Sequence, residues 1–330
     1  MGIVRAIGRV RALALMPMIG FLLLAGCSQL IDGNMAEPVQ KFKDPETNQP
    51  YLLYRPSGYD PKKNWPLMVV CSSSFPDSPN KRIQDWAALA ESRGFLVLAP
   101  TMRATTGTFA PKTAKQLPQQ REDERHLLAA IQHVRAGHSV SDDRVFLQGY
   151  GSGATSALYT GLKHPDLFRA IDLSDPKFHA SCLGEVAERV DPHQPVQVHY
   201  RITDKILGSH GKNCEDWLRS HGADLREDRP GPSDPGDALG AVGFFEDVLR
   251  TVPWMQLRVR LPDPNRPREL KFKLDCSFTP TQYQWDFGDG QTSPIAEPMH
   301  AYAQPGTYRA TVTVHAGKSA QHRFRDVVVP

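Results

Sequence analysis

A short stretch near the middle of the chain, residues 144–153 (RVFLQGYGSG), constrains the fold more than any other part of the sequence. Its apolar residues predict a buried strand. Gly149, Gly151 and Gly153 then occupy every second position, and a helical pattern begins at Ser152. Glycine at such a junction indicates that two backbones approach too closely for side chains. The stretch therefore predicts a strand, a sharp turn and a helix of an α/β protein.

Strands and helices alternate on both sides of this turn. Apolar runs such as LMVVC (67–71) and FLVLAP (95–100) are typical of parallel strands that are buried on both faces. Residues 101–120 show no clear period and predict a long surface loop. The alternation predicts a doubly wound, mostly parallel sheet. The other expected strands are 51–56, 170–173 and 196–200, and the expected helices are 83–93, 122–136, 152–163, 212–220 and 238–250.

These residues resemble one family, the secreted polyhydroxybutyrate depolymerase and feruloyl esterase-like branch of the α/β-hydrolases. The resemblance covers about residues 51–249 and rests on the motifs YRPSGYD, WPLMVV, EDERHLLAAIQHV, SDDRVFLQGYGSG and HPDLFRAI. It implies an α/β-hydrolase domain at residues 50–252. It also implies that residues 144–153 form the nucleophile elbow, whose usual pattern is G-x-S-x-G.

The catalytic positions depart from this family's pattern. Gly151 stands where the resemblance places the nucleophilic serine, and Ser72 and Ser73 stand where such enzymes begin the oxyanion hole with His-Gly. Asp204 falls at the position of the triad acid, although it could equally cap or brace a turn. Residues 225–250, where the triad base is expected, contain no histidine. Serine acyl transfer needs a nucleophile, a base, an orienting acid and an oxyanion hole, so we expect no catalytic residue.

The residues that could replace the missing catalytic groups are poorly placed for that role. Ser152 is one residue beyond the turn, and we expect it to satisfy a backbone N–H at the helix start. His199 is predicted inside a strand. The helical pair His126 and His133 has no partner at metal-ligand spacing, so packing or surface roles are expected for both. No G-x-G-x-x-G follows the first strand and no Walker pattern occurs, so no cofactor and no metal are expected.

The N-terminal residues predict a targeting segment. Residues 1–11 carry three arginines and no acid, and an apolar run at 12–25 follows that is short for a membrane span. The run ends in LAGC, which resembles a bacterial lipobox. The resemblance implies a lipoprotein signal peptide at residues 1–26 and lipidation of Cys27. The expected location is the cell envelope, at the outer membrane if the host has two membranes, or facing the periplasm. The polar residues 27–49 predict a flexible tether.

Charge and cysteine content limit the partners of the mature chain. The formal net charge of +3 includes three leader arginines, and 3 − 3 leaves a mature chain near zero, so no nucleic-acid partner is expected. Among the remaining cysteines, Cys71 lies in a buried strand and Cys276 in another module. Cys182 and Cys214 follow neighbouring strands, so the sequence predicts a disulfide between them.

The hydrophobic period changes from helical to alternating after residue 253. The segments YQWDFGDG (283–290), HAY (300–302) and PGTYRATVTV (305–314) resemble a PKD domain, a small immunoglobulin-like β-sandwich. The resemblance implies such a domain at residues 253–330, serving as a spacer or as a contact to proteins and polysaccharides. Asp286 and Asp289 are better explained as turn formers than as calcium ligands.

Two function classes remain. The preferred one is an exported, lipid-anchored, non-catalytic protein that binds a polysaccharide, a polymer or an envelope protein. The alternative is an active carboxylic-ester hydrolase that uses a displaced nucleophile. A fluorophosphonate probe separates the two, because a working serine hydrolase reacts with it covalently.

Overall fold

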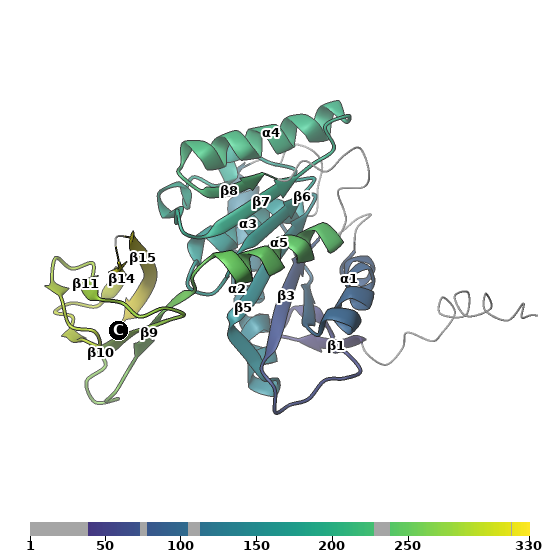
Figure 1. Cartoon of the computed structure of the whole chain (residues 1–330). Helices are drawn as coiled ribbons and strands as arrows, with labels where there is room; N and C mark the ends of the chain where they lie inside the picture. Colours follow the sequence, from purple (N-terminus) through teal and green to yellow (C-terminus); the bar gives the residue numbers. More distant parts are fainter. Residues whose placement is uncertain (1–38, 73–77, 105–112, 228–237, 318) are drawn as a thin grey trace, which may run out of the picture. The chain divides into compact units, whose positions relative to one another are not determined.

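The computed structural model describes residues 39–72, 78–104, 113–227, 238–317 and 319–330 (Figure 1). These described residues belong to one compact unit. The predicted signal peptide and the lipidation residue Cys27 lie outside the described residues. None of the helices within the described ranges has the length and apolar character needed to cross a membrane.

The first part of the compact unit is built on one eight-stranded sheet with the order β1-β2-β4-β3-β5-β6-β7-β8 (Figure 1). Strands β3 to β8 are parallel, whereas β2 runs antiparallel to both β1 and β4. This is the α/β-hydrolase fold, which confirms the predicted fold class. The strands are β1 (Val39–Lys43), β2 (Pro50–Tyr54), β3 (Trp65–Cys71), β4 (Leu96–Pro100), β5 (Val140–Tyr150), β6 (Ile171–Ser174), β7 (Pro195–His199) and β8 (Asp224–Glu227).

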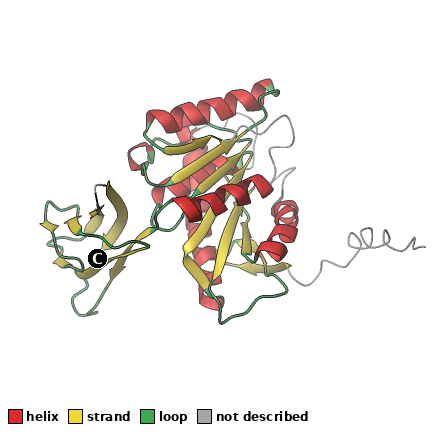
Figure 2. Cartoon of the chain, in the orientation of Figure 1, coloured by secondary structure: helices red, strands yellow, loops and turns green. Residues whose placement is uncertain are grey.

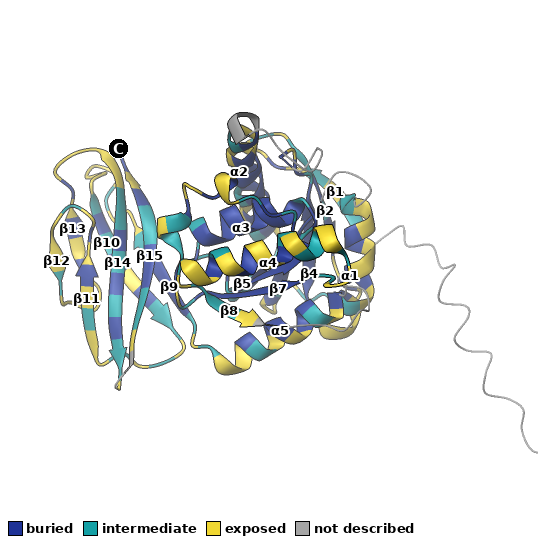
Figure 3. Ribbon diagram, turned by 90° about the horizontal axis from the view of Figure 1, so that it is seen from above, coloured by how far each residue is buried: buried dark blue, intermediate teal, exposed yellow. Residues whose placement is uncertain are grey.

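Helices cover both faces of this sheet, so its strands are buried on both sides (Figures 2 and 3). Along β3, Leu67 and Val69 belong to one apolar cluster, and Met68 and Val70 belong to the other. This alternation explains the continuous apolar run in the sequence. Helices α2 (Thr113–Gly137), α3 (Gly153–Lys163) and α4 (Lys205–Ser220) join the first cluster, and α1 (Pro79–Arg93) and α5 (Ala238–Thr251) join the second.

Three helices begin earlier than the sequence pattern predicts, and one of them is α1, which begins at Pro79 and not at residue 83. Helix α2 starts at Thr113, inside the segment expected to be a surface loop, and it contains Pro118. Helix α4 starts at Lys205 because Asp204 caps it. The first turn of α2 (TAKQ) has little apolar character, and in α4 the apolar Ile206 and Leu207 are followed by polar or small residues at 208–213, so no sustained apolar period marks either start in the sequence. Helix α1 is capped at its start by Ser78, whose side chain accepts a bond from the Lys81 N–H, and it ends at Gly94, which has φ of +75°.

The C-terminal part of the unit is an all-β sandwich of two antiparallel sheets, as predicted. Trp285 and Phe287 are buried in its core with Tyr302. Asp286 and Asp289 accept hydrogen bonds from the N–H groups of residues 288 and 291, which agrees with turn formation. The strands are β9 (Met255–Arg260), β10 (Glu269–Cys276), β11 (Gln282–Asp286), β12 (Thr292–Ser293), β13 (Met299–Ala301), β14 (Gly306–Ala316) and β15 (Ser319–Val329).

The predicted tether is corrected by the position of β1. Val39–Lys43 pair with Pro50–Tyr54 at the edge of the large sheet, and Asp44 holds the connecting turn by accepting hydrogen bonds from three backbone N–H groups. Residues 39–49 therefore belong to the folded domain and not to a tether. Pairing with a neighbouring strand outweighs the polar composition of this segment.

The predicted disulfide between Cys182 and Cys214 is wrong, because both are free, fully buried thiols. Cys182 ends the short helix η1 (Ala180–Cys182), where its carbonyl accepts a hydrogen bond of 3.1 Å from Gln120. Cys214 lies on the buried face of α4. Burial raises the pKa of both thiols, which disfavours the thiolate that disulfide formation needs. The order of strands alone does not determine whether two cysteines that follow neighbouring strands come close enough to be bridged.

Candidate functional site

The turn after β5 has the backbone geometry of a nucleophile elbow. Gly151 has φ of +59°, and its N–H donates to the Ser174 carbonyl at the end of β6 (3.0 Å). Its own carbonyl accepts from the N–H groups of Lys177 (2.9 Å) and Ala154 (3.3 Å). These bonds tie the turn to the next strand and to helix α3, so its conformation is fixed on both sides.

The two framing glycines are required by close backbone contacts. A Cβ on Gly149 would lie 2.6 Å from the Cα of Ala154, and a Cβ on Gly153 would lie 2.6 Å from the carbonyl oxygen of Cys71. A Cβ on Gly151 would meet nothing within 4 Å. The elbow therefore keeps its shape and keeps room for a side chain at the apex, but the residue there has none.

Two serines near the elbow, Ser72 and Ser152, lie within the described residues. Ser72 follows β3 and is 2% exposed, and its hydroxyl has no hydrogen-bond partner within the described part of the chain. Ser73 lies outside the described residues. Ser152 is the N-cap of α3 in a right-handed conformation, but its side chain makes no capping hydrogen bond, so the expected capping role is wrong.

Asp204 acts as a helix cap. Its Oδ1 accepts hydrogen bonds from the N–H groups of Ile206 (2.9 Å) and Leu207 (3.0 Å) at the start of α4. The bond from the Leu207 N–H lowers the pKa of this carboxyl, and the bond from Ile206 adds to the effect. The residue at the expected position of the triad acid therefore has a structural role.

A buried polar network that the sequence analysis missed lies beneath helix α5. The Nε2 of His199 is 2.5 Å from Oδ1 of Asp172, and the hydroxyl of Ser174 is 3.5 Å from the other oxygen of that carboxylate. These are the residue types of a catalytic triad in the wrong order, because a triad needs the histidine between the serine and the aspartate. All three side chains are at most 3% exposed. Ser174 and His199 are register partners on the neighbouring strands β6 and β7. This register brings the network together, and it cannot be read from the sequence.

Asp175 braces the strand ends beside the elbow. It has φ of +44°, which is uncommon for a residue other than glycine, and it is 2% exposed. Its carboxylate accepts from the Arg201 N–H (3.1 Å) and forms an ion pair of 2.7 Å with the Arg201 guanidinium. Burial raises the pKa of Asp175, although Arg201 opposes that shift. Arg201 thus neutralises a buried carboxylate.

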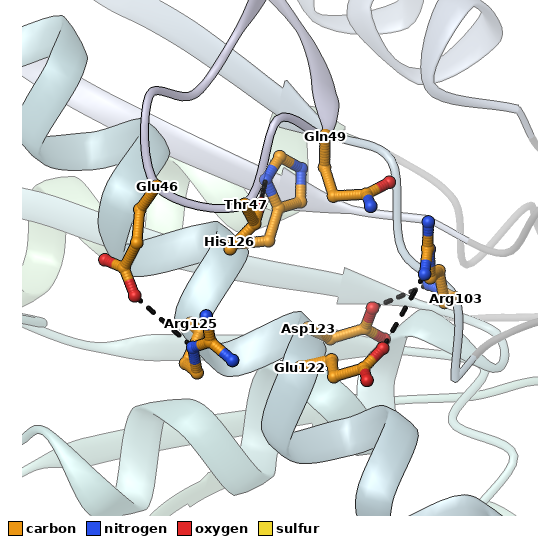
Figure 4. A pocket seen from close by; sticks show the side chains of 8 residues that line it. All are labelled: Glu46, Thr47, Gln49, Arg103, Glu122, Asp123, Arg125 and His126. Carbon is orange, nitrogen blue, oxygen red and sulfur yellow. Dashed lines mark hydrogen bonds and ion pairs between the residues drawn. The ribbon is translucent and has the colours of Figure 1, made fainter.

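A polar cavity of about 270 Å³ lies between the turn before β2, the residues after β4 and the middle of α2. Figure 4 shows the side chains that line it. The Nδ1 of His126 lies 2.7 Å from Oδ2 of Asp44, and Asp123 accepts hydrogen bonds from the backbone of Arg103 and Ala104. These bonds anchor loops at the edge of the sheet. The residues that line the cavity are Glu46, Thr47, Gln49, Arg103, Glu122, Asp123, Arg125 and His126.

The titration behaviour of this cavity also reflects a structural role. Burial raises the pKa of Asp123 to about 6 and lowers that of His126. Burial alone would also raise the pKa of Asp44, but hydrogen bonds from Thr47 and His126 lower it to about 2. His126 is 1% exposed, and the Nδ1 of His133 shares a hydrogen bond of 2.9 Å with the Tyr51 hydroxyl. Both histidines therefore pack inside the domain. In the described ranges, no cluster of three or more His, Cys, Asp or Glu residues could hold a metal ion.

Comparison with protein families finds a match in the C-terminal part of the chain. The model of the PKD domain family matches residues 267–329. No curated protein matches the chain in a sequence search. The PKD1 domain of the Vibrio cholerae metalloprotease PrtV is 25% identical and covers 23% of this chain and 95% of its own, with a TM-score of 0.21.

The larger domain is similar to solved esterases and peptidases. A ferulic acid esterase from Anaeromyces mucronatus is 14% identical, covers 65% of this chain and 89% of its own, and has a TM-score of 0.44. A dipeptidyl aminopeptidase IV from Bacteroides ovatus is 14% identical and has a TM-score of 0.46. The match covers 64% of this chain but only 34% of the peptidase, about a third of its length. The assignment of the α/β-hydrolase fold rests on the strand order and on the elbow after β5.

Proposed function

We propose that this chain is an exported, lipid-anchored protein whose hydrolase-fold domain binds a partner and does not catalyse acyl transfer. One observation carries the proposal. The apex of an intact elbow holds Gly151, in the backbone conformation of a nucleophile and with open space beside it, yet without a nucleophilic atom.

The lack of a histidine at the position of the catalytic base supports the same conclusion. Residues 225–250 contain no histidine, and His199 at the end of β7 is buried against Asp172. Loss of the serine or of the histidine from a serine protease lowers turnover by roughly a millionfold. A retained fold with two missing catalytic groups is better suited to binding than to turnover.

The proposed location follows from the leader and from Cys27. Lipid attachment would hold the mature chain at a membrane of the cell envelope, and the PKD domain would serve as a spacer or as a second contact surface. A polysaccharide, a polymer or an envelope protein is the proposed class of partner.

Ester hydrolysis tests the loss of activity. The purified chain and its Gly151→Ser variant are assayed with p-nitrophenyl esters of two to eight acyl carbons, with a Ser152→Ala variant as the control for a displaced nucleophile. We expect turnover at the uncatalysed rate for all three, because no base replaces the missing histidine. Saturable turnover by the wild-type chain that disappears in Ser152→Ala would instead support the ester hydrolase alternative.

A further inference from the structure

A second cavity, of about 340 Å³, lies within the compact unit between helix α2 and strands β9 and β15. Its volume falls within the range of small-molecule sites in proteins. Its lining consists of three apolar residues, three arginines, two acids, two glutamines and one histidine. The residues that line it are Leu128, Ile131, Gln132, Arg135, His164, Asp166, Leu167, Gln256, Arg258, Arg325 and Asp326.

Several polar atoms at this cavity lack partners. Gln256 is 4% exposed, and its amide N–H donates to the Asp166 carbonyl (3.1 Å), but its Oε1 accepts no hydrogen bond from the described residues. The Nε of Arg135 is buried and has no hydrogen-bond partner among the described residues, and its buried Nη2 has only a long ion pair of 3.5 Å with Asp142. A buried donor or acceptor without a partner costs about 1–3 kcal/mol, so such groups normally have a ligand or water.

Arg135 and Arg325 are each paired with a single carboxylate at 3.5–3.6 Å, whereas Arg258 has two closer partners, and only Arg135 has buried N–H groups without a hydrogen-bond acceptor among the described residues. Asp142 lies 2.5 Å from Arg258 but 3.5 Å from Arg135, and Arg258 also pairs with Asp275 at 3.0 Å. Arg325 lies 3.6 Å from Asp166 and donates to a backbone carbonyl. A carboxylate in the cavity would complete the partners of Arg135, because a guanidinium presents paired N–H donors that match its two oxygens.

We propose that this cavity binds a small carboxylate that also carries hydroxyl groups, of the size of one sugar acid. Arg135 donates to the carboxylate, and Oε1 of Gln256 accepts from a hydroxyl. The side chains of Leu128, Ile131 and Leu167 supply apolar contacts to the carbon skeleton. The site is separate from the elbow, so it stands whether or not the elbow is catalytic.

Isothermal titration of the purified full chain with D-glucuronate tests this assignment. We expect saturable binding that weakens with added salt, and binding of the uncharged methyl glucoside that is at least about tenfold weaker, because it lacks the carboxylate. Arg135→Gln should weaken glucuronate binding by about tenfold or more. Arg125→Gln is the matched control, since Arg125 is an exposed arginine on the same helix, and it should bind as the wild type does.

A second variant, Gln256→Glu, keeps the assignment testable if Arg135→Gln does not fold. Gln256→Glu keeps the side-chain shape and places a negative charge against the ligand, so it should abolish glucuronate binding while the melting temperature reports an intact fold. The assignment is overturned if glucuronate does not saturate, if methyl glucoside binds equally well, or if a folded Arg135→Gln or Gln256→Glu chain binds glucuronate like the wild type.

Discussion

Gly151 adopts φ of +59°, a conformation in which an L-residue strains its own backbone, and no neighbour occupies the space where a Cβ would lie. Gly151→Ser should therefore lower the free energy of unfolding by about 1–2 kcal/mol through backbone strain alone. Chemical denaturation measures this difference.

Gly184 offers a matched control for that substitution. It also has open space around its Cβ position, but its backbone is not in the left-handed region. Gly184→Ser should leave stability close to that of the wild type. If Gly151→Ser is no less stable than Gly184→Ser, the turn after β5 is not under the strain that an elbow serine bears.

Asp123 should make stability depend on pH. Its pKa in the folded chain is raised by burial to about 6, above its ordinary value of 3.8. The protonated carboxyl therefore stabilises the fold below about pH 4, and this contribution, on the order of 3 kcal/mol, is lost as the pH rises through 6. Asp44 has the opposite sign, because its lowered pKa contributes stability that is lost as the pH falls from about 4 toward 2.

The unfolding free energies of the wild type and Asp123→Asn between pH 4 and 8 separate this contribution. The difference between the two chains should change in favour of the variant as the pH rises, because asparagine cannot ionise. Asp216→Asn, a change at an exposed carboxylate of α4, is the control and should follow the wild type. Parallel curves for Asp123→Asn and the wild type would show that Asp123 does not titrate in this range.

At the scale of the element, helix α4 depends on its cap. Asp204→Ala removes the acceptor of two backbone N–H groups and should cost about 1 kcal/mol of stability. Asp204→Ser keeps an acceptor and should recover most of that loss. Thermal and chemical denaturation measure both variants. A fully stable alanine variant would show that the cap contributes nothing.

The sequence predicted those elements whose patterns are local. The glycine-framed turn and the buried strands follow from spacing and from apolar runs, and the structure confirms both. The start of α2 and the strand β1 were missed, because their residues are polar and are ordered by packing and pairing with distant parts of the chain.

The site was predictable to a similar extent. Gly151 and the capping role of Asp204 follow from local motifs. The pair formed by Asp172 and His199, and the free thiols that replace the predicted disulfide, depend on strand register and side-chain direction, which the sequence does not state.

At the scale of the whole molecule, the proposed lipid anchor at Cys27 is testable. Cells that express the chain and are fed a labelled fatty acid should incorporate the label into the wild type and not into Cys27→Ala, because the lipid is attached to that sulfur. The wild-type chain should also fractionate with membranes. Label in Cys27→Ala would show that the lipobox assignment is wrong.

Reaction with a fluorophosphonate probe tests the central claim, that the hydrolase fold is retained without its nucleophile. The purified chain is incubated with the probe and its intact mass is measured, with a known serine hydrolase as the positive control. The account predicts an unmodified mass for the wild-type chain under conditions that label the control completely. A stoichiometric covalent adduct on a serine of the wild-type chain, lost when that serine is changed to alanine, would contradict it.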